Sequence, residues 1–100
     1  MVTVHPIETV VSDPNIRHGQ AIIAGRDVRV IDVVASHLYR GLPPEELATN
    51  FALDMGQVYA ALAYYYQNKS ELDRQLRQEV TAAQRWADQL DAQGKLTRLD

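Results

Sequence analysis

Two segments in the middle of the chain repeat apolar residues at intervals of three and four. An α-helix has 3.6 residues per turn, so this spacing places the apolar side chains on one face of a helix. The pattern therefore predicts two amphipathic helices. Their apolar positions are Ile31, Val34, Ala35 and Leu38 in the first and Val58, Ala61, Leu62 and Tyr65 in the second.

The ends of these helices carry residues suited to helix termini. Gly41 can adopt the left-handed conformation that commonly ends a helix, and Pro44 can open a short helix that stops near Asn50. Asp54 is suited to the N-cap of the next helix, because its carboxylate can accept from the backbone N–H of Gln57. The side-chain oxygen of Gln57 can in turn accept from the backbone N–H of Asp54, which completes a capping box. The sequence thus predicts three short helices joined by short connections.

A different pattern precedes the helices. Residues 2–11 alternate loosely and are rich in Val and Thr, which predicts a short strand, and residues 12–15 supply turn chemistry. Two apolar segments, 21–24 and 28–30, flank Gly25, which can supply the positive φ of a tight turn. The sequence therefore predicts a β-hairpin at this point.

The chain after Lys69 changes to a run that is rich in Gln, Asp and Arg and has no Gly or Pro before Gly94. Its apolar residues advance by three or four and form a narrow seam, which predicts a long helix with Ser70 as N-cap and Gly94 as its stop. The seam consists of Leu72, Leu76, Val80, Ala83, Ala87 and Leu90, with Trp86 at its edge. A seam this narrow needs a covering surface, which is the chain's own core, a second copy or another protein.

These elements define the expected fold class as α+β and mainly α. The architecture is an N-terminal strand and β-hairpin, a three-helix core of the homeodomain-like or winged helix-turn-helix kind, and a long C-terminal helix. The change of composition after Lys69 predicts a domain boundary there, with a core domain over residues 1–69 and a C-terminal helical tail over residues 70–100.

The composition indicates a small soluble protein with one modest core. The chain has 100 residues, 46% of them hydrophobic and none of them cysteine, which excludes disulfides, thiolate metal sites and cysteine nucleophiles. No segment approaches the roughly 18 apolar residues of a membrane span, so no membrane association is expected. The first residues also lack the basic start and apolar run of a secretory signal, and a cytoplasmic location is therefore expected.

Catalytic and metal-binding patterns are absent from the sequence. His5, His18 and His37 are far apart, none has the spacing of paired metal ligands, and no Gly-rich phosphate loop occurs. Ser12 and Asp13 precede a proline, and this arrangement is typical of a turn rather than of a nucleophile with its base. A non-enzymatic protein without a cofactor or metal is expected.

The distribution of charge bears on nucleic-acid binding. Ten basic residues against thirteen acidic ones give a net charge of −3, which disfavours a protein that holds a phosphate backbone by bulk charge. Three arginines nevertheless gather around the predicted hairpin. Arg17, Arg26 and Arg29 are candidates for contact with the phosphates of duplex DNA, as the wing of a winged helix would supply. The alternative is that they form a solvated face.

The outer face of the third predicted helix has no lysine or arginine. It carries small residues, which let another helix approach closely, and this favours self-association over the reading of DNA bases. The expected dimerisation residues are Gly56, Ala60, Ala63 and Tyr64. Closed two-fold dimers are the commonest assembly of soluble proteins, so a homodimer is expected.

A series of short motifs runs through the first two thirds of the chain. The motifs are His5-Pro6-Ile7, Asp13-Pro14, Gly19, Ile22-Ile23-Ala24-Gly25, Val28, Val30, Gly41, Pro44-Glu45-Glu46-Leu47 and Val58-Tyr59-Ala60-Ala61-Leu62-Ala63-Tyr64-Tyr65. In this order they resemble the small prokaryotic domain-of-unknown-function 433 family. The resemblance implies a homeodomain-like or winged helix-turn-helix module and an antitoxin function beside a toxin of the PIN-like ribonuclease class. The family usually has an arginine where this chain has Asp27, so no role of that arginine carries over.

The resemblance and the tail together lead to one hypothesis of function. The protein is expected to be a non-enzymatic antitoxin that binds and inhibits a PIN-like ribonuclease toxin through its C-terminal helix and represses its own operon as a dimer. A helix bound in a groove is a common mode of protein recognition, and the expected toxin-binding residues are Leu76, Val80, Ala83, Trp86 and Leu90. Two alternatives remain open, a DNA-binding regulator without a toxin and a dimeric interaction module.

Overall fold

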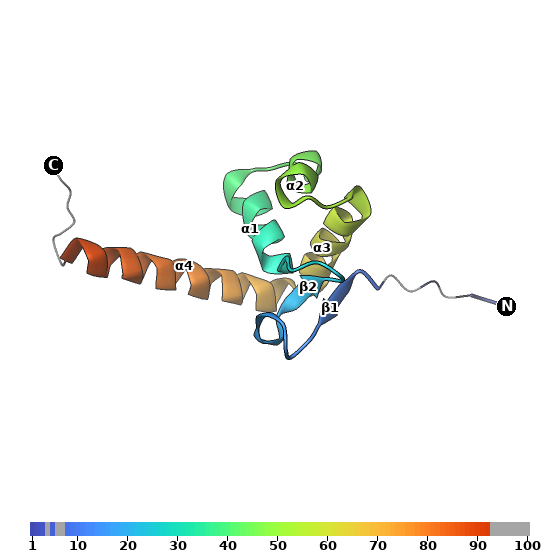
Figure 1. Ribbon diagram of the computed structural model, residues 1–100, viewed down its shortest axis with the longest axis horizontal. Helices are drawn as coiled ribbons and strands as arrows, with labels where there is room; N and C mark the ends of the chain where they lie inside the picture. The colour runs from blue at the N-terminus through green and yellow to red at the C-terminus, as the bar shows by residue number, and fades with distance from the viewer. Residues whose placement is uncertain (4, 6–7, 93–100) are drawn as a thin grey trace. The chain divides into compact units, whose positions relative to one another are not determined.

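A computed structural model describes residues 1–3, 5 and 8–92 of the chain. These residues form a two-stranded antiparallel sheet, one short 3₁₀ turn and four α-helices (Figure 1). In chain order the elements are β1 (Val10–Ser12), η1 (Arg17–Gly19), β2 (Ala21–Ile23), α1 (Val30–Arg40), α2 (Pro44–Phe51), α3 (Met55–Gln67) and α4 (Lys69–Ala92). The expectation of a mainly helical protein with a small N-terminal sheet is confirmed.

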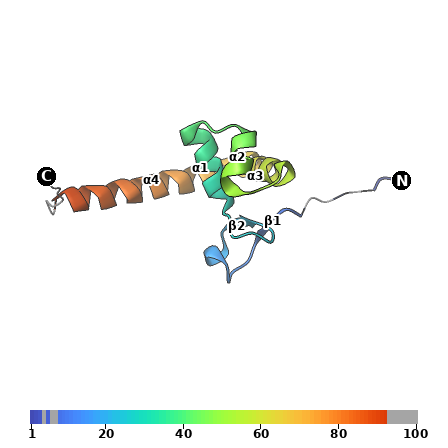
Figure 2. The ribbon, with the colours of Figure 1, turned by 45° about the horizontal axis from the view of Figure 1, so that its top comes forward.

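The contacts divide the chain into two compact units, Met1–Lys69 and Ser70–Asp100. In the first unit α1, α2 and α3 contact one another, while β2 contacts α1 and β1 contacts α3, so the sheet lies beside α1 and α3 (Figure 2). The described part of the second unit is residues 70–92 of the helix α4. Each unit is therefore described by itself.

The sheet brings together two short strands that lie nine residues apart in the chain. Val10 faces Ile23, and Ser12 faces Ala21. The predicted turn after β1 is present, since the backbone carbonyl of Asp13 accepts from the N–H of Ile16 at 2.9 Å. The Asp13 side chain also accepts from a backbone N–H in the same turn.

The predicted hairpin over residues 21–30 is only partly correct. The turn at Gly25 forms, with φ +76° and a bond from the N–H of Arg26 to the carbonyl of Ile23. The second strand does not form, because α1 already begins at Val30, and the described pairing after the turn is one isolated bridge at Arg29. The apolar pair Val28 and Val30 has the spacing of a strand, but Val30 also belongs to the helical repeat, and the helix is what forms.

The first unit is built around one apolar core. The predicted buried face of α3 is confirmed, with Val58 and Ala61 fully buried. The buried apolar residues of this unit are Ile22, Ile23, Val30, Ile31, Val33, Val34, Leu47, Leu53, Val58, Ala61, Leu62 and Tyr65. Each Val, Leu or Ile side chain that is fully removed from water stabilises the fold by about 1.5–3 kcal/mol, so this cluster is the main source of the unit's stability.

The predicted apolar face of α1 is buried at its start and exposed at its end. Leu38 is 42% exposed, whereas Val33, which the helical repeat did not include, is fully buried. The buried residues lie in the first two turns of α1 and cover more than one side of it. Periodicity identifies the face of a helix, but it does not tell how far along the helix the neighbouring elements reach.

Gly41 ends α1 as predicted. Its φ is +70°, the left-handed value that glycine adopts without a steric cost, and its N–H donates to the carbonyl of Ser36. The Nδ1 atom of His37 lies 2.8 Å from the carbonyl oxygen of Leu42, so the imidazole donates its Nδ1–H there. These bonds fix the short connection that turns the chain from α1 into α2.

The connection from α2 to α3 combines a strained residue with a strong cap. Asp54 and Gln57 form the predicted capping box, with bonds of 2.8 Å from the N–H of Gln57 to Asp54 and 2.9 Å from the N–H of Asp54 to the Gln57 side chain. Just before this box the chain leaves α2 through Ala52, whose φ is +56°. An L-residue in this left-handed region loses roughly 1–2 kcal/mol to the contact of its Cβ with the backbone.

We expect Ala52→Gly to stabilise the protein by about 1 kcal/mol, because glycine removes the Cβ that makes the left-handed conformation costly. Ala52 is exposed, so few contacts are lost. The matched control is Ala48→Gly inside α2, which should destabilise by about 1 kcal/mol through the lower helix propensity of glycine. Urea denaturation of the three full chains measures both changes. A loss of stability in both variants would contradict the assignment of strain to Ala52.

The start of α4 differs from the expectation. The helix begins at Lys69, so Ser70 lies inside it and is not its N-cap. Asn68 separates the two helices, and its backbone N–H and side-chain amide both donate to the carbonyl of Tyr64. The predicted stop at Gly94 lies outside the described residues.

Candidate functional site

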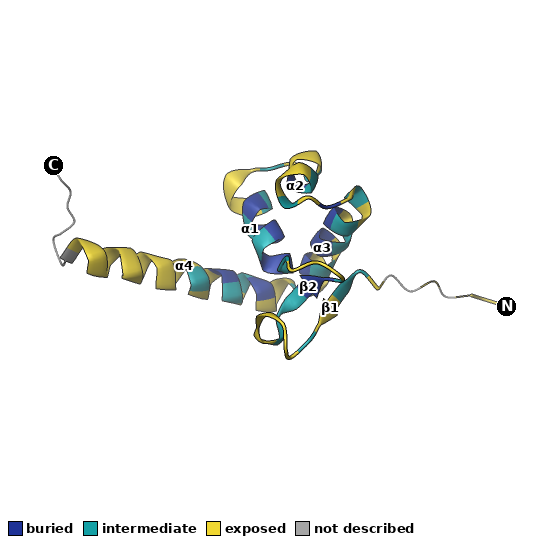
Figure 3. Cartoon of the chain, viewed as in Figure 1, coloured by how far each residue is buried: buried dark blue, intermediate teal, exposed yellow. Residues whose placement is uncertain are grey.

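The last four turns of α4 expose a line of apolar side chains. Trp86 is 64% exposed, Val80 54% and Leu90 43%, and Ala83 is exposed between them. Figure 3 shows this part of α4 as exposed along its length. We call Val80, Ala83, Trp86 and Leu90 the distal seam. Leu76 was predicted to belong to the same surface; it is 4% exposed, and its part in partner binding stays a prediction.

The distal seam is a continuous surface because of helix geometry. At 100° per residue its four residues fall within roughly one third of the helix circumference, and they extend over about 15 Å along the axis. Outside the distal seam, hydrogen bonds between side chains one helical turn apart stabilise α4. Gln84 donates to Asp88 at 3.0 Å, and Gln75 donates to Glu79 at 3.2 Å. The seam is thus a narrow apolar strip on a helix with a polar remainder.

The predicted dimerisation residues lie on the outer side of α3. Ala60, Ala63 and Tyr64 line one hollow of about 420 Å³, together with Gln67 of α3, Val10 of β1 and His5. Gly56 lies on the same side of α3 one turn earlier, is exposed, and is not part of this hollow. The structure therefore brings three of the four predicted residues together.

Two of the three arginines predicted to bind DNA are held by carboxylates. The Arg17 Nε donates to Asp27 at 2.8 Å, and the residue itself sits in a left-handed turn with φ +51°. Arg29 forms a two-point ion pair with Asp32 at 2.7 and 3.0 Å, and it also donates to the side chain of Gln20 at 2.8 Å. The Arg17 pair is exposed to solvent, with side chains 45% and 69% exposed, and an ion pair of this kind is weak.

Arg29 is also partly removed from water, with a side chain 19% exposed. Its contacts join the start of α1 to the segment before β2. Arg26 is exposed and forms no ion pair among the described residues. The pair of Arg29 with Asp32 has helical spacing and could be inferred from the sequence, whereas Arg17 and Asp27 are ten residues apart and meet only in the folded chain.

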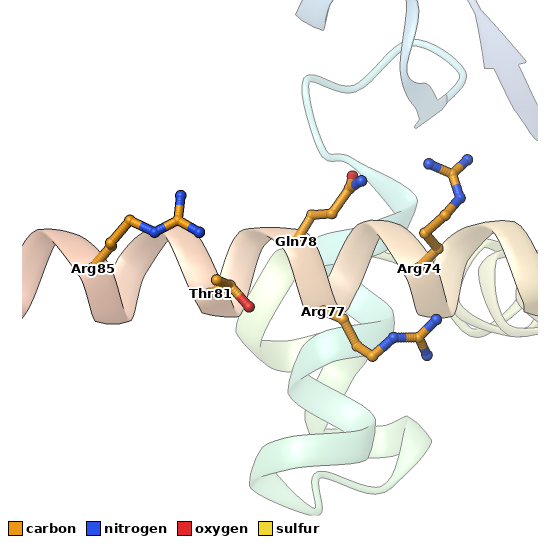
Figure 4. Close-up of a pocket in the computed structure, with 5 residues that line it drawn as sticks. All are labelled: Arg74, Arg77, Gln78, Thr81 and Arg85. Carbon is orange, nitrogen blue, oxygen red and sulfur yellow. The ribbon is translucent and has the colours of Figure 1, made fainter.

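A basic surface on α4 was missed by the sequence prediction. Arg74, Arg77, Gln78, Thr81 and Arg85 border a shallow hollow of about 330 Å³. Figure 4 shows Arg74, Gln78 and Arg85 projecting from one side of the helix, with Arg77 and Thr81 on the adjoining side. The sequence does contain these five polar residues at intervals of one to four, which places them on one side of a helix. The three arginines are not consecutive in the sequence, so they form a basic surface only when the segment is helical.

The described part of the chain offers neither a cluster of metal ligands nor a membrane span. Within residues 1–3, 5 and 8–92, no group of three or more His, Asp or Glu side chains is placed to hold a metal ion. None of the helices in these ranges combines the length and the apolar composition that crossing a membrane requires.

Comparison with known proteins gives the family. The model of the family described as "Protein of unknown function (DUF433)" matches residues 10–65, more than half of the chain. The chain belongs to this family. The DUF433 match runs from β1 to near the end of α3 and so covers the core, the sheet and the hairpin arginines, but not α4. No curated protein and no solved structure matches the chain.

Proposed function

We propose that this DUF433 protein is a non-enzymatic, cytoplasmic antitoxin-like protein, which binds and inhibits a PIN-like ribonuclease toxin through the distal seam of α4. The observation that carries the proposal is the exposure of Val80, Trp86 and Leu90 in one line on a helix. A soluble protein rarely exposes a contiguous apolar surface without a use for it, and such a strip fits a helix bound in a groove. The class of partner rests on the family resemblance.

The seam has the composition of a binding anchor. Tryptophan is the residue most enriched among those that dominate binding energy, because its ring buries a large area with few rotatable bonds. Trp86 is the most exposed apolar side chain of the distal seam. The adjoining Val80 and Leu90 can exclude water around it, which is how neighbouring contacts contribute in such interfaces.

A second candidate function is a DNA-binding regulator without a toxin. The succession of α1, α2 and α3, with a three-residue turn from Ala52 to Asp54 between the last two, favours a helix-turn-helix of the homeodomain-like or winged kind. The exposed side of α3 has no lysine or arginine, and this disfavours base reading by that helix. Repression of the protein's own operon would therefore depend on contacts made elsewhere.

The proposal includes a homodimer formed at the hollow on α3. Ala63 is exposed at the centre of the predicted surface, so Ala63→Glu would bury an unpaired carboxylate in any dimer formed there. We expect this change to raise the dimer dissociation constant by about tenfold or more. Light scattering across the micromolar range measures it, with Ala82→Glu on exposed α4 as the matched control. A monomeric parent chain, or a variant as dimeric as the control, would show that α3 is not the interface.

The test of the proposed function uses the product of the neighbouring reading frame. The expected result is that this product cleaves RNA and arrests growth, and that an equimolar amount of the DUF433 chain abolishes both effects. The paired variant Val80→Ser with Leu90→Ser should restore ribonuclease activity, because it removes the apolar side chains on both sides of Trp86.

The matched control is the paired variant Gln78→Ser with Thr81→Ser. It also places two serines on the exposed part of α4, but on the side of the helix away from the distal seam. Inhibition by this control should equal the parent's. A product without ribonuclease activity, or with activity unaffected by excess DUF433 chain, would refute the proposal.

A further inference from the structure

The basic surface on α4 consists of hydrogen-bond donors on one stretch of helix. Arg74 and Arg85 are eleven residues apart, which separates them by about 16 Å along the axis. Arg77 lies beside this line, and Gln78 and Thr81 lie between its ends (Figure 4). We call these five residues the arginine face.

The charges of the arginine face are not neutralised within the described part of the chain. None of its three arginines forms an ion pair there, in contrast to Arg17 and Arg29. Between Arg74 and Arg85 the single acidic residue is Glu79, which lies about 140° around the helix from Arg74. Glu79 accepts from Gln75 on that side of the helix.

We infer that the arginine face binds the phosphate backbone of duplex DNA. Arginine, glutamine and threonine are among the side chains that donate to phosphate oxygens, and the face presents all three types together. A row of arginines over about 16 Å suits a backbone that carries one charge per roughly 1.7 Å of duplex axis. Such binding depends on charge and not on base sequence, because contacts to phosphate carry no sequence information.

The net charge of −3 does not oppose this inference, because the charge that matters is local. A helix with its side chains is about 10–12 Å across, and the Debye length at 0.1 M salt is about 10 Å. Carboxylates on the far side of α4 are therefore largely screened from a ligand on the arginine face. Glu71, Asp73 and Asp88 lie just beyond its two ends, each within about one helical turn of an arginine of the face.

The inference goes beyond the proposed function and does not depend on it. The arginine face is centred roughly opposite the distal seam on the same helix, since Ala83 lies about 180° around the axis from Arg74. One face of α4 can thus contact DNA while the other contacts a protein. It also assigns the DNA contact to residues that are free of ion pairs among the described ones, in place of Arg17 and Arg29.

The experiment measures binding of the full chain to a labelled DNA duplex by fluorescence anisotropy from 50 to 200 mM salt. Three phosphate contacts predict that the affinity of the parent chain falls about 40-fold over this range. The double variant Arg74→Gln with Arg85→Gln should reduce the slope of log affinity against log salt by about 1.8 and weaken binding about 60-fold at 0.1 M salt. Glutamine has nearly the helix propensity of arginine, and circular dichroism confirms that the helix remains.

The control is Arg40→Glu at the end of α1, which changes the net charge by the same two units at a residue that is not part of the arginine face. It should leave the salt slope unchanged and weaken binding less than about threefold. Equal losses in the two variants, no binding by the parent chain at 50 mM salt, or competition by polyglutamate as strong as by unlabelled duplex would each overturn the inference. The last result would identify an acidic protein surface as the ligand.

Discussion

Leu47→Ala should destabilise the protein by about 3 kcal/mol, within the range observed when a buried leucine is truncated in a core. Leu47 is fully buried and is the only buried residue of α2. It therefore provides most of the apolar anchoring of this helix against α1 and α3, with both of which α2 makes contacts. A short helix of eight residues has little stability of its own, so the loss extends to the turn that follows it.

The measurement is thermal and urea denaturation of the full chain. A loss of about 3 kcal/mol corresponds to a decrease of roughly 15 °C in the melting temperature for a domain of this size. The matched control is Leu38→Ala on α1, which removes the same atoms from a residue that is 42% exposed and should cost less than about 1 kcal/mol. Similar losses in the two variants would mean that Leu38 is buried and that the core described above is misplaced.

The contrast between these two leucines shows what the sequence could predict. The capping box of Asp54 and Gln57 and the left-handed Gly41 were predictable, because each depends on residues within a few positions. Leu38 lies on the predicted apolar face of α1 and is nevertheless exposed, because exposure at the end of a helix depends on where other elements stop. Local chemistry is encoded over short distances in the chain, whereas the extent of burial is set by tertiary packing.

The strand expected at residues 28–30 illustrates a competition between two local patterns. Val28 and Val30 alternate as in a strand, while Val30, Val33 and Val34 fit a helix. The helix begins at Val30, with Arg29 as its N-cap residue and Asp32 in its first turn pairing with Arg29. The sequence contained both signals, and the ion pair favours the helical one.

The candidate site was only partly predictable for the same reason. The distal seam followed from helical period alone, and three of its residues are strongly exposed as a binding surface requires. The ion pair of Arg17 with Asp27 depends on a turn that returns the chain after ten residues, and no local pattern indicated it. The arginine face could have been predicted from the sequence, because the helical period that identifies the apolar seam also places Arg74, Arg77 and Arg85 on one side of the same helix.

Trp86→Ala should weaken binding of the toxin about 30-fold, or about 2 kcal/mol, as truncation of an aromatic anchor commonly does. Trp86 is 64% exposed in the free chain, so the same change should alter the melting temperature by no more than a few degrees. Titration of the toxin's ribonuclease activity with the parent and variant chains measures the affinity. The control is Tyr39→Ala on α1, which removes another aromatic ring, 59% exposed, from the other unit.

The two variants distinguish a specific contribution of the distal seam to toxin binding from a general effect of removing an exposed aromatic ring. Binding by a helix in a groove buries the ring only if α4 is the contacting element, so Tyr39→Ala should leave inhibition unchanged while Trp86→Ala weakens it. The reverse result would place the toxin on the first unit, where Tyr39 lies. A third outcome is normal inhibition by Trp86→Ala together with loss of inhibition in the paired Val80→Ser and Leu90→Ser variant. It would mean that the distal seam binds the toxin but that Trp86 does not dominate the binding energy, because a dominant residue is identified by the cost of its truncation.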